Sequence, residues 1–293
     1  MERILGVNRE KLISLMCCSV CRGDLAREAH TLVCARGHGK FFIDREARWH
    51  LIDSASAQKY QSEHSSGVNR IKSFFKPYPR LYYFLWHIFC PVLLSGKRPS
   101  SVRKLISDSA VVVNLGSGPR RIAPGFVNVD VAPFPEVDIV ADAIRLPFKD
   151  NSVDALVHES LFEHLPDPEA AAREIARVLK PGGIMYASIP FLTPYHASPD
   201  DFNRWTASGM RRLFHFCTPV EQGVDAGPWS AMLVFVAYWI GVTFSFGSRK
   251  AAPAIGLLSM TILGPLKIFD YLFARLPGAD AVAAQLYFIG RKK

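Results

Sequence analysis

The chain has 293 residues, of which 49% are hydrophobic, and it carries a formal net charge of +9 at pH 7. This length can bury a full core and indicates two folding units rather than one. The six cysteines are not spaced like a disulfide framework, and residues 1–11 have no apolar run. We therefore expect a reducing compartment and no secretory signal, which excludes a secreted disulfide scaffold.

The positive charge lies in the first third of the chain. Residues 1–110 hold 18 Lys and Arg against 9 Asp and Glu, whereas residues 111–293 hold 17 of each kind. Eight basic residues and no acidic one lie between His64 and Ser107. We expect a polyanionic partner at this end: nucleic acid, anionic lipid or a phosphorylated substrate. A solvated basic linker is the alternative.

Residues 1–55 form the first expected unit and carry two pairs of candidate metal ligands. A Cys-x2-Cys pair is followed after 12 residues by a Cys-x3-His pair. The four candidate ligands are Cys18, Cys21, Cys34 and His38. Two such pairs can close tetrahedrally around zinc, and the metal would stabilise a unit that lacks a large core. Cys17 could compete with Cys18, and the alternative is unrelated buried thiols beside a surface histidine.

Residues 56–110 form an expected linker that interleaves basic and aromatic residues. Its apolar run, Leu81–Phe89, is too short to span a membrane and lies between Arg80 and Lys97. Aromatic side chains among cations suit an anionic membrane surface, and they also suit stacking on single-stranded nucleic acid.

Residues 111–217 alternate strand and helix signals, which is typical of an α/β fold. We predict a helix that begins at Asp167, and strands at 111–115, 126–129, 137–141, 153–158 and 184–190. At the carboxyl end of the first strand, the turn Gly116–Gly118 lies where a doubly wound sheet binds nucleotide-like ligands. Two acids follow at the ends of the next two strands. Asp130 can accept ribose hydroxyls, and Asp142 lies beside Ala143, where an adenine edge could lie.

The expected cofactor site therefore collects residues from several strand ends. Its candidates are Asn114, Gly116, Ser117, Gly118, Asp130, Asp142, Ala143 and Glu159.

The stretch Val111–Pro190 resembles a class I S-adenosylmethionine-dependent methyltransferase of the small-molecule and lipid-acting type. The segments that carry the resemblance are NLGSGP at 114–119, VNVD at 127–130, LFEHLPD at 161–167 and ARVLKPGGIMYASIP at 176–190. The resemblance implies a doubly wound, Rossmann-like methyltransferase sheet and S-adenosyl-L-methionine as cofactor. The spacing of the N-terminal ligand pairs is similar to the zinc ribbon of ribosomal RNA guanine methyltransferases. Asn114 stands where the family usually has an acid, which motivates the alternative of a binding module without catalysis.

The segment Pro194–Thr206 carries the candidate acceptor chemistry. Here His196 is a candidate base that Asp200 or Asp201 could orient, and Arg204 could hold a phosphate or carboxylate. The segment resembles one in methyltransferases associated with bacterial surface-polysaccharide synthesis. The alternative is a structural lid in which Asp201 pairs with Arg204. We predict His196, His164, Asp201 and Arg204 as catalytic residues and expect His158 to be structural.

Residues 218–293 form an apolar, mostly helical C-terminal extension in this interpretation. No charged residue occurs from 227 to 248, a length that could cross a bilayer. A full hairpin would leave Arg249 and Lys250 on the outer side, against the positive-inside tendency. We therefore expect a shallow hairpin or helices in the interface, with a buried helical cap on the sheet as the alternative.

Our leading hypothesis is a methyltransferase at the inner face of the cell membrane, either peripheral or shallowly inserted. It would O-methylate a saccharide or a lipid-linked intermediate, with an anionic membrane surface as partner. An RNA base methyltransferase is the first alternative, favoured by the ribbon and the basic charge. A non-catalytic binding module with a methyltransferase fold is the second.

Overall fold

A computed structural model describes residues 9–28, 31–44, 47–52, 84, 88, 90–196 and 200–293. In chain order the strands are β1 (Leu25–Glu28), β2 (Thr31–Cys34), β3 (Lys40–Ile43), β4 (Trp49–His50), β5 (Val112–Leu115), β6 (Phe126–Asp130), β7 (Ile139–Val140), β8 (Val153–Glu159), β9 (Leu179–Pro190), β10 (Cys217–Ala226) and β11 (Gln285–Lys292). Most of the expected linker, and most of its run at 81–89, lies outside the described residues.

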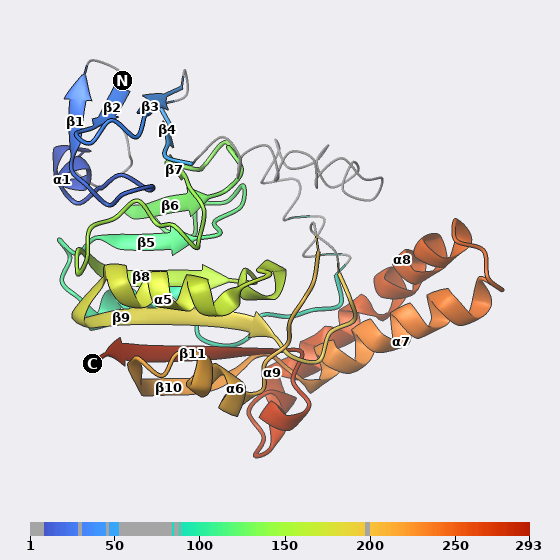
Figure 1. Ribbon diagram of the computed structural model, residues 1–293. Coiled ribbons are helices and arrows are strands. Elements are labelled where there is room, and N and C mark those ends of the chain that lie inside the picture. Colours follow the sequence, from blue (N-terminus) through green and yellow to red (C-terminus); the bar gives the residue numbers. More distant parts are fainter. Residues whose placement is uncertain are drawn as a thin grey trace.

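All the strands of the described residues belong to one sheet, with the order β1-β2-β3-β4-β7-β6-β5-β8-β9-β11-β10 (Figure 1). From β4 to β9 neighbouring strands are parallel, and β11 is antiparallel to both β9 and β10. The predicted doubly wound α/β sheet is confirmed in this central part. Its parallel strands point their carboxyl ends toward one edge, where the predicted cofactor turn lies.

The centre of the sheet is buried on both faces. On one face Val113 and Leu115 of β5 pack in the same core as Ile175 of helix α5 (Pro168–Val178), which also takes in α1 (Arg9–Ser14) and α6 (Ala207–Leu213). On the other face Val112 packs with Val102 of the 3-10 helix η1 (Pro99–Leu105). Burial on both sides explains the continuous β-branched run that predicted this strand.

Helix α5 begins where the sequence predicted. The side chain of Asp167 caps it by accepting a hydrogen bond of 2.9 Å from the backbone N–H of Ala170, and Pro168 occupies its first turn. The helix ends at Val178, directly before β9. Its buried Glu174 accepts hydrogen bonds from Arg177 of the same helix and Arg22 of the N-terminal unit.

The N-terminal unit is continuous with the central sheet. Strand β4 pairs in parallel with β7, and the N–H groups of Trp49 and Leu51 donate to the carbonyls of Asp138 and Val140, both at 2.9 Å. Met16 and Phe148 form a further β-bridge. The first and third expected units therefore share hydrogen bonds and a core.

The C-terminal region differs from the expected boundary at residue 217. Strands β10 and β11 complete the sheet, so only the part between them is an extension. Strand β10 was not predicted because it carries Pro219 and Gly223, which weaken a strand signal. The extension consists of α7 (Pro228–Phe244), α8 (Ala251–Leu263), η3 (Gly264–Phe269), α9 (Asp270–Phe273) and η4 (Ala279–Ala281).

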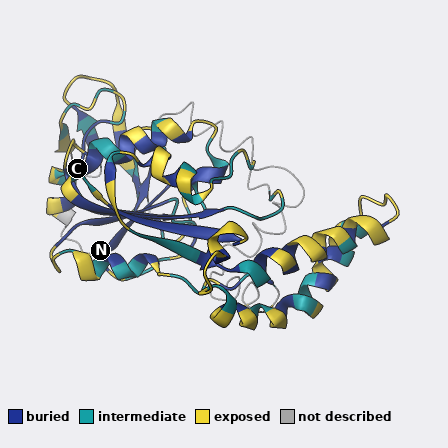
Figure 2. Cartoon of the chain, turned by 90° about the horizontal axis from the view of Figure 1, so that it is seen from below, coloured by how far each residue is buried: buried dark blue, intermediate teal, exposed yellow. Residues whose placement is uncertain are grey.

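Helices α7 and α8 form a hairpin that projects beyond the sheet instead of covering one of its faces (Figures 1 and 2). They cross closely, since a Cβ added at Gly241 would lie 3.1 Å from Cα of Gly256. Apolar side chains stay exposed along both helices. On α7 these include Trp239 and Val242, and Val242 is 68% exposed. By length and composition, one helical segment of the described chain, Ala251–Phe273, could cross a membrane, and 17% of its apolar window is buried.

Candidate cofactor and acceptor site

The predicted glycine turn lies at the carboxyl end of β5. Gly116 and Gly118 both have positive φ, at 66° and 58°, a region that favours glycine. A Cβ added at Gly116 would lie 2.9 Å from Cδ1 of Leu161, so the segment after β8 closes over the turn. Ser117 lies between them, and its N–H donates to the carbonyl of Val129 on β6.

Asp130 fixes this turn to the end of β6. Its Oδ2 accepts a 2.8 Å hydrogen bond from the N–H of Gly118, and its Oδ1 accepts one of 2.9 Å from Ala132. A carboxylate has about four lone-pair positions, so these two bonds are compatible with a ribose contact as well. Asp130 therefore shapes the turn in addition to its predicted contact.

Asn114 is buried between strands. Its Nδ2 donates to Oδ1 of Asn128 at 3.0 Å, and Nδ2 of Asn128 donates to the carbonyl of Glu136 at 2.8 Å. Asn128 was not among the predicted site residues. The side-chain amide of Asn114 thus links β5 to β6. A contact between Asn114 and the cofactor stays a prediction.

Two further candidates lie at neighbouring strand ends. Asp142 follows β7, and its Oδ1 accepts from the N–H of Ile144 at 3.1 Å, while Ala143 beside it is buried. Glu159 ends β8 and pairs with Arg120, which follows the glycine turn, at 3.1 Å. Burial raises the pKa of Glu159, and the charge of Arg120 opposes that rise. The Glu159–Arg120 pair joins the end of β8 to the turn after β5, and the parallel pairing of β7 with β6 places Asp142 at the same edge.

The predicted catalytic residues come together beside that edge. His164 closes the 3-10 helix η2 (Phe162–His164), and its ring centroid lies 5.2 Å from that of His196, on the segment after β9. Nδ1 of His196 lies 3.2 Å from Oδ2 of Asp201. The structure therefore brings together both histidines and the acid that was expected to orient His196.

Arg204 is engaged differently from its expected role. It forms an ion pair with Asp201, three residues before it, and Nη2 also donates to the carbonyl of Pro194 at 3.4 Å. Burial raises the pKa of Asp201, but the hydrogen bonds from Arg204 and from the backbone N–H of His196, together with the charges of both residues, outweigh burial, and the pKa lies below its usual value. The geometry matches the alternative of a structural pair, because the charge of Arg204 is already balanced.

Glu163 was not among the predicted site residues. Its side chain is fully buried, and burial raises its pKa to about 8. Its Oε1 lies 3.7 Å from Nε2 of His164 and 3.9 Å from Nε2 of His196. Only its position before His164 in the sequence pointed to it, since the contact with His196 depends on tertiary structure.

A second buried acid was also missed. Asp225 of β10 is hydrogen-bonded to the hydroxyl of Ser188 on β9, which accepts from Nε2 of Gln285 at 2.8 Å. Burial raises the pKa of Asp225 to about 7.

His158, expected to be structural, is fully buried, and its ring centroid lies 4.5 Å from that of Phe162. Burial lowers the pKa of His158 to about 3.

The predicted zinc ligands converge. The Sγ atoms of Cys18, Cys21 and Cys34 lie within 4.8 Å of one another, and Nδ1 of His38 lies 3.7 Å from Sγ of Cys34. A backbone N–H from Gly23 donates to Sγ of Cys21 at 3.4 Å, as expected where a tight turn presents a thiolate. These residues therefore fit a tetrahedral zinc ion. Cys17 is buried and does not belong to this cluster.

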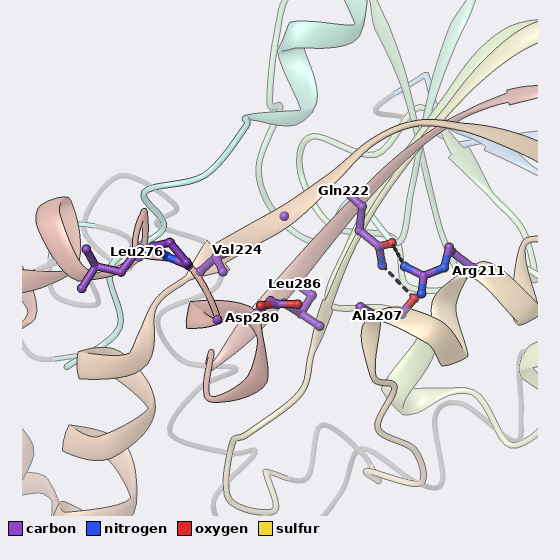
Figure 3. Close-up of a pocket in the computed structure, with 11 residues that line it drawn as sticks. Ala207, Arg211, Gln222, Val224, Leu276, Asp280 and Leu286 are labelled. Atoms are coloured by element: carbon purple, nitrogen blue, oxygen red, sulfur yellow. Dashed lines mark hydrogen bonds between the residues drawn. The ribbon is translucent and has the colours of Figure 1, made fainter.

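A surface hollow of about 410 Å³ lies elsewhere, between α6, β10 and the segment before η4 (Figure 3). Within it Arg211 donates to Gln222 at 2.7 Å, and Gln222 donates to the carbonyl of Ala207. None of the candidate site residues lines this hollow.

Comparisons with known proteins agree with the central fold. Residues 122–187 match a family model described as a methyltransferase domain. The chain is 35% identical over 103 residues to a demethylmenaquinone methyltransferase of Paenarthrobacter aurescens, over 35% of this chain and 40% of that protein.

Two solved structures align with part of this chain at low similarity. A Thermotoga maritima protein, described as an S-adenosylmethionine-dependent methyltransferase and possible histamine N-methyltransferase, has a TM-score of 0.43 at 16% identity over 75% of this chain and 98% of its own. A Haemonchus contortus phosphoethanolamine N-methyltransferase in complex with S-adenosyl-L-methionine has a TM-score of 0.40 at 16% identity, over 62% and 48% of the two chains.

The family match and the sequence relative support a class I, S-adenosylmethionine-dependent methyltransferase domain in the centre of this chain. The chain covers less than half the length of the demethylmenaquinone methyltransferase that it matches.

Proposed function

We propose that the protein is an S-adenosylmethionine-dependent methyltransferase that acts at the inner face of the cell membrane on a hydroxyl of a saccharide or lipid-linked intermediate. The observation that carries the proposal is that the candidate cofactor residues and the candidate acceptor residues lie at the same edge of the sheet. The turn fixed by Asp130 lies at this edge, and so does the cluster of His164 and His196.

The positions of the cofactor candidates support their proposed roles. In this proposal Asp130 takes the ribose, while Asp142 and Ala143, one strand further, border the adenine. When bound, S-adenosyl-L-methionine supplies a methyl group on a positively charged sulfur. We propose that Asn114 and Glu159 complete the site at the ends of β5 and β8.

His196 is the proposed base. Its Nδ1 lies 3.2 Å from Oδ2 of Asp201, so in this proposal its Nε2, which lies 3.9 Å from Oε1 of Glu163, takes the proton of the acceptor hydroxyl. The acceptor oxygen would then be able to take the methyl group that bound S-adenosyl-L-methionine would supply, with the electron pair of the broken carbon–sulfur bond left on sulfur. Asp201 and Arg204 position the histidine.

The hairpin of α7 and α8 supports the membrane location. It leaves the molecule at the end toward which the parallel strands point, which is the end of the candidate site (Figure 1). With 17 residues, α7 is about 25 Å long at 1.5 Å per residue, shorter than a hydrocarbon core of about 30 Å. Exposed Arg249 and Lys250 lie at its tip. These features favour a hairpin that lies in the interface, with its cations at anionic headgroups.

We also propose a structural zinc ion in the N-terminal ribbon, held by the four converging ligands. Because β4 extends the sheet at β7, zinc would stabilise the edge next to the predicted adenine position.

The experiment that tests the proposal is methyl transfer from labelled S-adenosyl-L-methionine to fractionated lipid, glycan and RNA pools. We expect label in the lipid or glycan fraction with the parent, at least a tenfold loss with His196→Gln, and parental transfer with the exposed control His215→Gln. Label confined to RNA would instead establish the RNA alternative. No label in any pool, with no cofactor binding, would leave only a binding module.

A further inference from the structure

The side chain of Glu163 is buried, and its carboxyl oxygens have no hydrogen-bond partner among the described residues. A buried polar group is normally hydrogen-bonded, and burying a carboxyl group without hydrogen bonds is costly. Its position therefore needs an explanation in terms of something that binds there.

Two histidines direct the same ring atom toward this carboxylate. Nε2 of His164 and Nε2 of His196 lie 3.7 Å and 3.9 Å from Oε1 of Glu163. One ligand atom from each of the three side chains lies within 4.8 Å of the others. In a tetrahedral site with bonds of about 2.1 Å, ligand atoms lie about 3.4 Å apart, so small side-chain movements would close the set.

The opposite nitrogen of each ring is held by an acceptor. Nδ1 of His164 lies 2.6 Å from the carbonyl oxygen of Asp200, and Nδ1 of His196 lies 3.2 Å from Oδ2 of Asp201. A carbonyl oxygen only accepts, so Nδ1 of His164 is the donor and the lone pair of the neutral ring is on Nε2. Histidines that ligate metals are oriented in this way, through a carboxylate or carbonyl on the other ring nitrogen.

We propose that Glu163, His164 and His196 bind a divalent transition-metal cation beside the cofactor turn. Two imidazoles and one carboxylate form a set that suits iron, cobalt or zinc and leaves coordination positions open. Hard oxygen-only cations fit it less well because two of the three ligands are nitrogen. The site is separate from the cysteine cluster, which belongs to the N-terminal unit.

The role of the cation rests on the proposed methyl transfer, although its binding does not. A divalent cation lowers the pKa of an oxygen that coordinates it. An acceptor hydroxyl bound at the open position would release its proton to water, and its oxygen would then form the bond to the methyl carbon. With the cation bound, Nε2 of His196 ligates it, so the cation takes over the activation of the hydroxyl that the proposal above gives to His196 in the metal-free protein.

A calorimetric titration with Co²⁺ tests the proposal. It uses the full-length, zinc-loaded protein. Co²⁺ binds nitrogen ligands well but ranks below zinc in affinity, so it leaves zinc in the thiolate cluster, which elemental analysis verifies. We expect one Co²⁺ per chain, and at least tenfold weaker binding in Glu163→Gln, His164→Gln and His196→Gln. The matched controls Glu169→Gln and His215→Gln alter exposed residues and should keep parental affinity.

Each outcome decides the question. Absence of Co²⁺ binding by the folded parent overturns the proposal, and so does binding that all three replacements leave intact. Circular dichroism identifies a variant that does not fold, and the two histidine variants then decide the outcome. If the parent transfers methyl groups but binds no Co²⁺, the metal site fails while the methyltransferase proposal stands.

Discussion

His158 makes the stability of the protein sensitive to acid. Its ring is fully buried between aromatic side chains, and both ring nitrogens are without a hydrogen-bond partner in the described chain. Burial disfavours the charged ring, which lowers the pKa from 6.5 to about 3. The unfolded chain therefore binds a proton below pH 6.5 that the folded chain does not bind until about pH 3.

The sign and the size follow from this difference. Because the unfolded state binds more protons in this window, the free energy of unfolding falls as the pH falls. From these two pKa values the loss between pH 7 and pH 5 is about 2 kcal/mol. His158→Leu removes the titrating group and should remove this part of the pH dependence, whatever its effect on absolute stability.

Urea denaturation of the parent and His158→Leu in mild detergent, at pH 7, 6 and 5, measures the effect. Val157→Ala is the matched control, because it disturbs the same buried strand without removing a titrating group. We expect the parent and the control to lose stability in parallel as the pH falls. The free energy of unfolding of the parent minus that of His158→Leu should be about 2 kcal/mol lower at pH 5 than at pH 7. A difference that does not change with pH would refute the reasoning.

Four further predictions can be tested on the same protein. Burial raises the pKa of Asp225 in the folded chain to about 7, so the parent should lose stability as the pH rises from 4 to 7. Asp225→Asn should not show this loss and should become more stable relative to the parent over that range. A difference in urea denaturation that does not change with pH would contradict this. Cys34→Ser should lower bound zinc well below one per chain and lower the melting temperature, and zinc content equal to the parent would exclude the ribbon site. Gly116→Val should weaken cofactor binding at least tenfold in calorimetry, because φ of 66° and the 2.9 Å approach to Leu161 both oppose a side chain, and unchanged affinity would count against the turn. Trp239→Glu, on an exposed helix face, should reduce flotation with anionic liposomes, and equal flotation would argue against the hairpin as the membrane contact.

The central strands could be predicted because their signals are local. The β-branched run before Gly116, the acids at 130 and 142 and the cap at Asp167 depend on a few neighbouring residues each. The pairing of Asp201 with Arg204 is also local, three residues apart, and it was foreseen as an alternative.

Features that depend on distant residues could not be predicted in this way. The two-residue strand β4 joins β7 from about 90 residues away, and no periodic pattern marks so short a strand. Strands β10 and β11 are separated by the whole apolar extension, which concealed their place in the sheet. The contact of Glu163 with His196 could not be predicted, because His196 lies on the segment after a different strand.

The most direct test of the methyltransferase assignment is calorimetric binding of S-adenosyl-L-methionine to the parent and to Asp130→Ala, with folding of both verified by circular dichroism. Asp130 holds the glycine turn by its contacts with Gly118 and Ala132 and lies where the ribose is expected. We predict one cofactor bound per chain of the parent and at least tenfold weaker binding by the variant. No binding by the folded parent, or equal binding by both proteins, would contradict the assignment.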